Sequence, residues 1–192
     1  MSNVNAPFGF KPARTFDGKP YSGAMNKYRL ASGYGTNIFS GDVVKMLTTG
    51  VLAKAAAGDQ MRGVVVGFSY VNPAGQPIIT NAWAAGTVTR NAAAVDVLVV
   101  DDPDVLFEAI FTNSASVPAI ADIGANFNLY DAGGDTARGI SGEGVDYTTL
   151  TTSAAQFQLV DFVQRPDNDI SSAYSRGLFV PKLHDFRVNT GV

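Results

Sequence analysis

With 192 residues and 20.2 kDa, the chain has the length of one domain or of two small ones. Apolar residues make up 46% of it and charged residues only 16%, whereas an average soluble protein carries about 25% charged residues. This composition excludes a strongly charged disordered chain and predicts a folded protein with a sparsely charged surface. The absence of cysteine excludes disulfides, thiolate catalysis and cysteine-ligated metals.

The net charge of -3 conceals an uneven distribution of charges along the sequence. Residues 1–30 carry +4, from five basic residues and one acidic residue, and residues 95–146 carry -9, from ten acidic residues and Arg138. Two such segments attract each other or bind opposite patches on partners, although charges placed only for solubility would look the same. The acidic centre argues against binding to nucleic acid. We also expect no membrane span and no secretory signal, since no apolar run is long enough and the first residues lack a basic segment followed by an apolar one.

Residues 1–24 predict an extended N-terminal arm. Prolines and glycines alternate through this segment, which disfavours both a helix and a central strand. The segment also carries four aromatic residues, and each would leave a large apolar face in water if the arm were free. We therefore expect the arm to lie extended with its rings docked on a surface. That surface belongs either to its own barrel or to a neighbouring chain, and we predict another chain. The residues expected to make this contact are Phe8, Phe10, Lys11, Arg14, Phe16 and Tyr21.

From residue 25 onward, short runs of strand-forming residues alternate with turn residues. The expected strands are Met25–Ala31, Val43–Leu47, Arg62–Val71, Gln76–Thr80, Thr87–Arg90, Val95–Val100, Val105–Thr112, Asn126–Tyr130, Tyr147–Thr152, Gln156–Gln164 and Leu178–Val188. Such frequent turn signals favour an all-β sandwich or small barrel over alternating strands and helices. We expect residues 25–192 to form it as one domain, in which the almost continuously apolar run Val95–Val100 is a central strand.

Only one short helix is expected. Ser116 is a candidate N-cap, and the segment from Val117 to Ile123, with Pro118 near its start, would end at Gly124. The glycine-rich residues 131–146 are expected to form a protruding or mobile loop.

The sequence offers little catalytic chemistry. Asp101, Asp102 and Asp104 form its densest carboxylate cluster, but their spacing matches no calcium loop, so a solvated turn is favoured over a metal site. His184 is the only histidine, and in a strand its neighbour Asp185 would point to the opposite face and could not orient it as a base. We therefore expect no enzymatic activity, no cofactor and no metal.

Trp83 is the only tryptophan, and two interpretations fit it. A single tryptophan in a barrel usually packs in the core or at the rim. An exposed one serves as an interface anchor or as a platform on which a sugar stacks. We retain Trp83 as a candidate interface residue.

Four short motifs follow one another in the first part of the β-rich region: Gly41–Val44, Thr49–Leu52, Ala55–Asp59 and Gly63–Gly67. Their order resembles that of the capsid decoration (cement) proteins of tailed bacteriophages, in which the first motif opens a strand and the third belongs to a hairpin. Further segments fall in a similar order, namely the acidic strand pair Val95–Glu108, the short helix Ile120–Gly124 and the strand Phe157–Phe162. The run Asn5–Pro12 is similar to the start of many virion proteins of podovirus type.

The resemblance implies a β-tulip-like barrel, made in the bacterial host cytoplasm and bound to the outer capsid surface of the virion. It implies a non-enzymatic structural protein that ties neighbouring major capsid protein subunits together as a dimer or trimer, with no nucleic-acid or membrane partner. Two alternatives remain open. One is a receptor- or glycan-binding module of a head or tail fibre, which an exposed Trp83 would favour. The other is a hydrolase, which would need a pocket that gathers Ser141, Asp135 and His184.

Overall fold

The computed structural model describes residues 3–113 and 117–187, and this part of the chain consists mainly of β-strands and turns. The strands are β1 (Lys11–Thr15), β2 (Asn26–Leu30), β3 (Ile38–Phe39), β4 (Val43–Met46), β5 (Leu52–Lys54), β6 (Gly63–Val71), β7 (Pro77–Thr80), β8 (Ala82–Trp83), β9 (Val95–Val100), β10 (Val105–Thr112), β11 (Asn126–Asp135), β12 (Ile140–Thr151), β13 (Phe157–Phe162) and β14 (Arg176–Pro181). The helical segments in these residues are two single 3-10 turns, η1 (Arg90–Ala92) and η2 (Ile120–Asp122). The predicted all-β class is confirmed.

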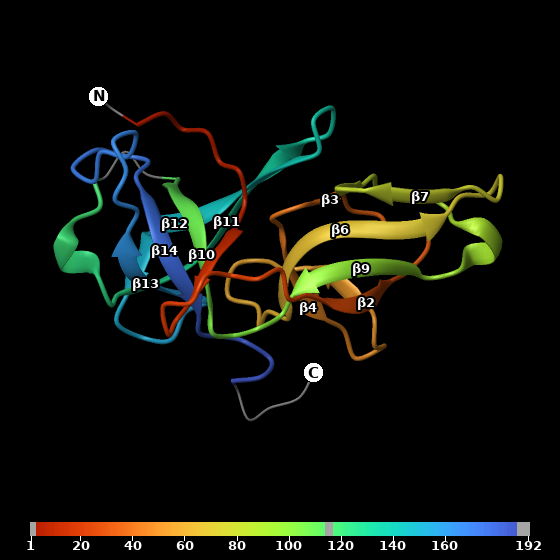
Figure 1. Cartoon of the computed structure of the whole chain (residues 1–192), viewed down its shortest axis with the longest axis horizontal. Helices are drawn as coiled ribbons and strands as arrows, with labels where there is room; N and C mark the ends of the chain where they lie inside the picture. The colour runs from red at the N-terminus through yellow and green to blue at the C-terminus, as the bar shows by residue number, and fades with distance from the viewer. Residues whose placement is uncertain (1–2, 114–116, 188–192) are drawn as a thin grey trace.

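Two β-layers lie side by side along the long axis of the molecule (Figure 1). The layer on the left of this view has the strand order β1-β10-β12-β11-β13-β14. The layer on the right has the order β2-β9-β6-β4-β5, with β7 paired to β6, and we call it the N-terminal sheet. Strands β3 and β8 form a separate two-stranded ribbon. Most of the strands expected after residue 25 are thus present and divided between two sheets, but the expected strand Thr87–Arg90 is wrong, because this segment leads into the turn η1.

The first of these layers closes into a small barrel, which we call the C-terminal barrel, because β14 pairs with β10 as well as with β13. Strand β10 divides its other edge between two partners: residues 105–108 pair with β1, and residues 111–112 pair in parallel with β12. A register shift between Pro12 and Arg14 accommodates the proline, which has no backbone N–H to donate to the ladder.

The buried apolar side chains form two clusters, one inside the N-terminal sheet and one at the C-terminal barrel that also includes Val43, Val64 and Val100 of the sheet. In the C-terminal barrel, the ring centroid of Phe111 lies 5.2 Å from that of Phe127 and 5.1 Å from that of Phe179, both in edge-to-face geometry. Such geometry is favourable for aromatic pairs and adds to the burial of their apolar area. In the N-terminal sheet, Phe68 and Trp83 pack among buried valines, leucines and isoleucine. Phenylalanines are therefore concentrated in the cluster at the barrel, whereas the cluster in the sheet is mainly aliphatic.

Strand β9 lies in the middle of the N-terminal sheet, between β2 and β6, as its apolar run predicted. The basic strand β2 is paired with it, and both Lys27 and Arg29 form ion pairs with Asp96, at 3.7 and 2.9 Å. Part of the attraction between the basic N-terminal region and the acidic centre is therefore satisfied within the chain.

Two local expectations are corrected. The helix expected from Val117 to Ile123 is reduced to the single turn η2, because Pro118 and Gly124 leave too few residues for an α-helical ladder. Its expected N-cap, Ser116, lies outside the described residues. The glycine-rich residues 131–146 belong largely to the β11–β12 hairpin and not to a loop, and this hairpin projects from the barrel, as the expected protrusion required (Figure 1).

Candidate functional site

The N-terminal arm is part of the C-terminal barrel. Phe10 is 1% exposed, and its ring stacks on that of Phe157 with 4.5 Å between the centroids. The next five residues are β1, paired to β10, and Tyr21 packs against the same core. The expectation that residues 1–24 dock on another chain is therefore wrong for Phe10 and β1, and a boundary at residue 24 does not separate arm from barrel. The barrel of the same chain already removes these apolar groups from water.

The ring of Phe8 is half-buried and lies near two cations. The Nζ atom of Lys11 is 4.5 Å from its centroid, and the guanidinium carbon of Arg176 is 5.7 Å from it. Cations at these distances are attracted to the face of an aromatic ring. Arg14 is half-buried on β1. Much of the predicted contact set is thus engaged within the chain.

Phe16 is the aromatic residue of the arm that stays largely in water, at 60% exposed. Its backbone N–H donates to the carbonyl oxygen of Asp104 at 2.7 Å. Phe186, 58% exposed, lies near the same turn, because the guanidinium of its neighbour Arg187 donates to the carbonyl oxygen of Pro103 at 2.8 Å and to the Asp104 carboxylate. The candidate functional site therefore contains two exposed phenylalanines whose segments both contact Asp104, and the ring of Phe186 also lies 4.7 Å from the guanidinium carbon of Arg62.

We call this site the Phe16–Phe186 surface. Its residues are Phe16, Lys19, Asp102, Asp104, Phe186 and Arg187. Large apolar side chains within a charged rim are typical of protein-binding sites. Phe16 was among the residues expected to contact a partner, whereas Phe186 was expected only as part of the strand Leu178–Val188. That strand ends at Pro181, and the following residues turn towards Met61, so the alternation of a strand no longer decides which side chains are buried.

The acidic turn at residues 101–104 is held by protein groups. The buried carboxylate of Asp101 accepts hydrogen bonds from the Asn26 amide at 2.9 Å and from the hydroxyl of Tyr28. Burial, together with this contact, raises the pKa of Tyr28 to about 12. Among the described residues, no group of three or more acidic or histidine side chains is arranged to hold a metal ion.

Trp83 is buried, with 1% of its surface exposed. Its indole N–H donates to the carbonyl oxygen of Tyr34 at 3.1 Å, and its ring meets that of Tyr70 edge to face at 5.6 Å. The prediction that Trp83 is an interface residue or a sugar platform is therefore wrong. The core of the N-terminal sheet offers the indole both apolar contacts and a hydrogen-bond acceptor.

Four charged side chains join the N-terminal sheet to the β11–β12 hairpin, and we call them the Lys54 cluster. The Nζ atom of Lys54 lies 2.8 Å from the carboxylate of Asp131, 3.3 Å from that of Asp42 and 3.5 Å from that of Glu143. Asp42 and Glu143 are fully buried. Burial, with repulsion from Asp42, raises the pKa of Glu143 well above its usual value, and burial also raises the pKa of Asp42. Burial alone would lower the pKa of Lys54, but the neighbouring carboxylates raise it, so the lysine stays charged.

Ser141, Asp135 and His184 do not meet in one site in the described part of the chain. Ser141 and Asp135 line a groove of about 510 Å³ beside the arm, and His184 is not among its lining residues. His184 lies instead beside Met61, where its Nδ1 accepts a hydrogen bond from the backbone N–H of Phe186 at 3.2 Å. Burial lowers the pKa of His184. The hydrolase alternative therefore lacks a histidine next to Ser141.

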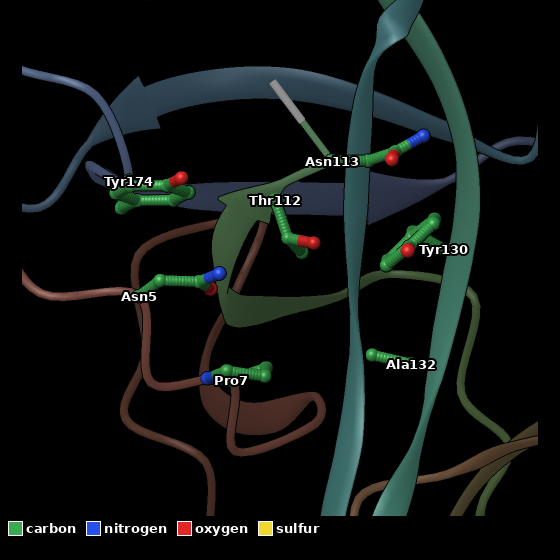
Figure 2. A pocket seen from close by; sticks show the side chains of 7 residues that line it. All are labelled: Asn5, Pro7, Thr112, Asn113, Tyr130, Ala132 and Tyr174. Carbon is green, nitrogen blue, oxygen red and sulfur yellow. The ribbon is translucent and has the colours of Figure 1, made fainter. Parts of the chain in front are cut away.

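A second pocket, of about 380 Å³, opens between the arm, the end of β10, strand β11 and the loop before β14 (Figure 2). It is lined by Asn5, Pro7, Thr112, Asn113, Tyr130, Ala132 and Tyr174. None of these residues is charged.

Comparisons with known proteins give no information about this site. No protein-family model matches the chain, and neither the curated proteins nor the solved structures include a significant match. Over residues 3–113 and 117–187, no helix is long and apolar enough to cross a membrane.

Proposed function

We propose that this chain is a non-enzymatic virion protein that binds the outer surface of a tailed-phage capsid and cements neighbouring major capsid protein subunits. The resemblance of Gly41–Val44 and Gly63–Gly67 to motifs of capsid decoration proteins supports this proposal. The local structure is compatible with that resemblance, since β4 begins at Val43, directly after Gly41 and Asp42, and β6 begins at Gly63.

The observation that carries the proposal is the exposure of Phe16 and Phe186. Their side chains are 60% and 58% exposed. Asp104 holds both segments, because it accepts a hydrogen bond from the backbone N–H of Phe16 and another from the side chain of Arg187, the neighbour of Phe186. Aromatic residues at the centre of an interface often provide most of its binding energy. Complete burial of a fully exposed phenylalanine contributes about 1.5–3 kcal/mol, so burial of the exposed part of these two rings would contribute about 1–2 kcal/mol each.

Cementing requires one molecule, or one oligomer, to contact at least two capsid subunits. We propose a dimer or a trimer, because copies related by a symmetry axis present the same surface to several capsid subunits. A protein that binds only the assembled lattice stabilises it by mass action, by about 2.7 kcal/mol per site at a hundredfold excess over Kd. Repeated over many sites, this contribution opposes the outward pressure of packaged DNA.

Purified particles test the proposal. We expect the protein in a fixed ratio to the major capsid protein, and we expect particles that lack it to release DNA at a lower temperature than decorated ones. Virions without the protein would contradict the proposal. If decorated particles, with the protein shown to be bound, and undecorated particles release their DNA at the same temperature, the cementing role is contradicted.

A further inference from the structure

The pocket in Figure 2 lies on the C-terminal barrel, and none of its lining residues belongs to the Phe16–Phe186 surface. Tyr174 and Tyr130 stand on opposite sides of it, and the side chains of Thr112 and Asn5 lie between them (Figure 2). Its volume of about 380 Å³ falls within the range of small-molecule sites in proteins. A single sugar unit or a short oligosaccharide end is of suitable size for such a space.

The lining of the pocket is polar but uncharged. Within the described residues, the Asn5 amide and the hydroxyls of Tyr130 and Tyr174 make no hydrogen bond to the protein, and so they are free to bond a ligand. Amides and hydroxyls donate and accept, whereas a phosphate or carboxylate ligand would call for arginine or lysine. The chemistry of this pocket therefore favours a neutral ligand that carries several hydroxyl groups.

Two tyrosine rings supply the apolar part of the site. Both Tyr130 and Tyr174 are half-buried, so each leaves part of its surface open to solvent. A ligand with a flat C–H face beside its hydroxyl groups uses such a ring and the neighbouring polar groups at once. A pyranose sugar has this combination of faces.

The backbone at the pocket is strained. Asn113 and Tyr174 have φ angles of +60°, and both line the pocket. Positive φ is tolerated by asparagine but is a true outlier for a bulky residue such as tyrosine. Strained residues of this kind gather at binding sites, where the surrounding structure holds them in place.

We propose that this pocket binds a neutral sugar, with the rings of Tyr130 and Tyr174 contacting its C–H faces and the Asn5 amide and the two tyrosine hydroxyls bonding its hydroxyl groups. The site is independent of the proposed cementing role, because the two surfaces share no residue. A capsid-bound protein with such a site would also attach the particle to neutral glycans. Sugar binding was one of the interpretations left open for Trp83, and the proposed site uses none of the surroundings of that residue.

Nuclear magnetic resonance titration of the full chain tests the proposal, with maltotriose, cellotriose and chitotriose as separate probes. We expect at least one of them to shift the resonances of the pocket residues with a Kd in the millimolar range, on the order of 1 mM. Tyr130→Ala and Tyr174→Asn should each weaken that binding at least about tenfold. Asparagine at position 174 keeps the positive φ accessible, so this variant is expected to fold.

Phe16→Ala is the matched control, because it removes an aromatic ring from the other surface and should leave sugar binding unchanged. N-acetyl-trialanine amide is the control ligand. The proposal is overturned if none of the three sugars shifts the pocket resonances up to about 20 mM. It is also overturned if the peptide binds there and the sugars do not. Neither result bears on capsid attachment, which Tyr174→Asn should leave intact.

Discussion

Phe10 stacks on Phe157 with an interplanar angle of 14°, so the tenth residue of the chain lies in the core of a barrel built mainly from residues beyond 100. This contact changes how an N-terminal truncation should be interpreted. Removing residues 1–20 would remove both the buried ring of Phe10 and the pairing of β1 with β10, and so it would destabilise the barrel itself. Single substitutions are therefore needed to separate the stability of the barrel from its binding.

Phe10→Ala should lower the free energy of unfolding by about 3–5 kcal/mol, because it deletes a fully buried ring and leaves a cavity against Phe157. Phe16→Ala should change it by less than about 0.5 kcal/mol, because that ring is mostly in water. Urea unfolding followed by circular dichroism measures both. An equal loss of unfolding free energy in the two variants would show that Phe10 is not part of the core.

Gly9 lies at a crossing of three segments. Its φ is +77°, and an added Cβ would lie 2.7 Å from the carbonyl oxygen of Gly41 and from the side chain of Ser141. Gly18 has a similar φ of +87° but open space around it. Both alanine variants strain the backbone, and only Gly9→Ala adds a clash, so it should cost about 1–3 kcal/mol more than Gly18→Ala. Thermal melts of the two variants check this difference, and coincident melting curves would be inconsistent with the close approach of arm and hairpin.

Glu143→Gln should change how stability depends on pH. Burial and repulsion from Asp42 raise the folded-state pKa of Glu143 well above its usual value of 4.5, although Lys54 lies nearby. Between 4.5 and the raised pKa the folded state binds more protons than the unfolded state, so this carboxyl stabilises the fold as the pH falls and the contribution is lost as the pH rises. The neutral glutamine removes this dependence. The variant should therefore be more stable than the wild type at pH 8, by a difference that shrinks towards pH 4.5. Unfolding curves across this range measure the difference, and a constant difference would contradict the burial of an ionisable Glu143.

Lys54→Met should be strongly destabilising, by about 3–5 kcal/mol, because it leaves the buried carboxylates of Asp42 and Glu143 without their cation. Lys45→Met is the matched control. Lys45 pairs with Asp59 at 2.7 Å, but both side chains are about one-third exposed, so its loss should cost less than about 1 kcal/mol. Similar costs in urea unfolding would mean that the Lys54 cluster adds no more than a surface ion pair.

The all-β class was predictable because turn residues and short strand-forming runs are local signals. Strand partners are not local. Strand β1 pairs with β10, about ninety residues later, and the residues from Lys11 to Thr15 carry no pattern that predicts this partner. Phe10 and Phe16 illustrate the same limit, since both are phenylalanines near proline and glycine, yet one is buried and the other exposed.

The candidate site was predictable only in part, for the same reason. Phe16 was expected to contact a partner, but Phe186 joins it through contacts of Arg187 with a turn more than eighty residues away. The Lys54 cluster also depends on tertiary structure, because Lys54 and Glu143 lie on different sheets. In the sequence, each is a charged residue within a strand pattern, and such residues usually lie on the surface.

Attachment to capsids tests the central claim most directly. Capsids that lack the protein are mixed with the wild type, with the double variant Phe16→Ala/Phe186→Ala, or with Tyr174→Asn, and the bound fraction is measured after sedimentation. If the Phe16–Phe186 surface binds the capsid, the double variant should bind at least about a hundredfold more weakly than the wild type, and Tyr174→Asn should bind like it. A folded double variant that binds capsids as tightly as the wild type would contradict the account.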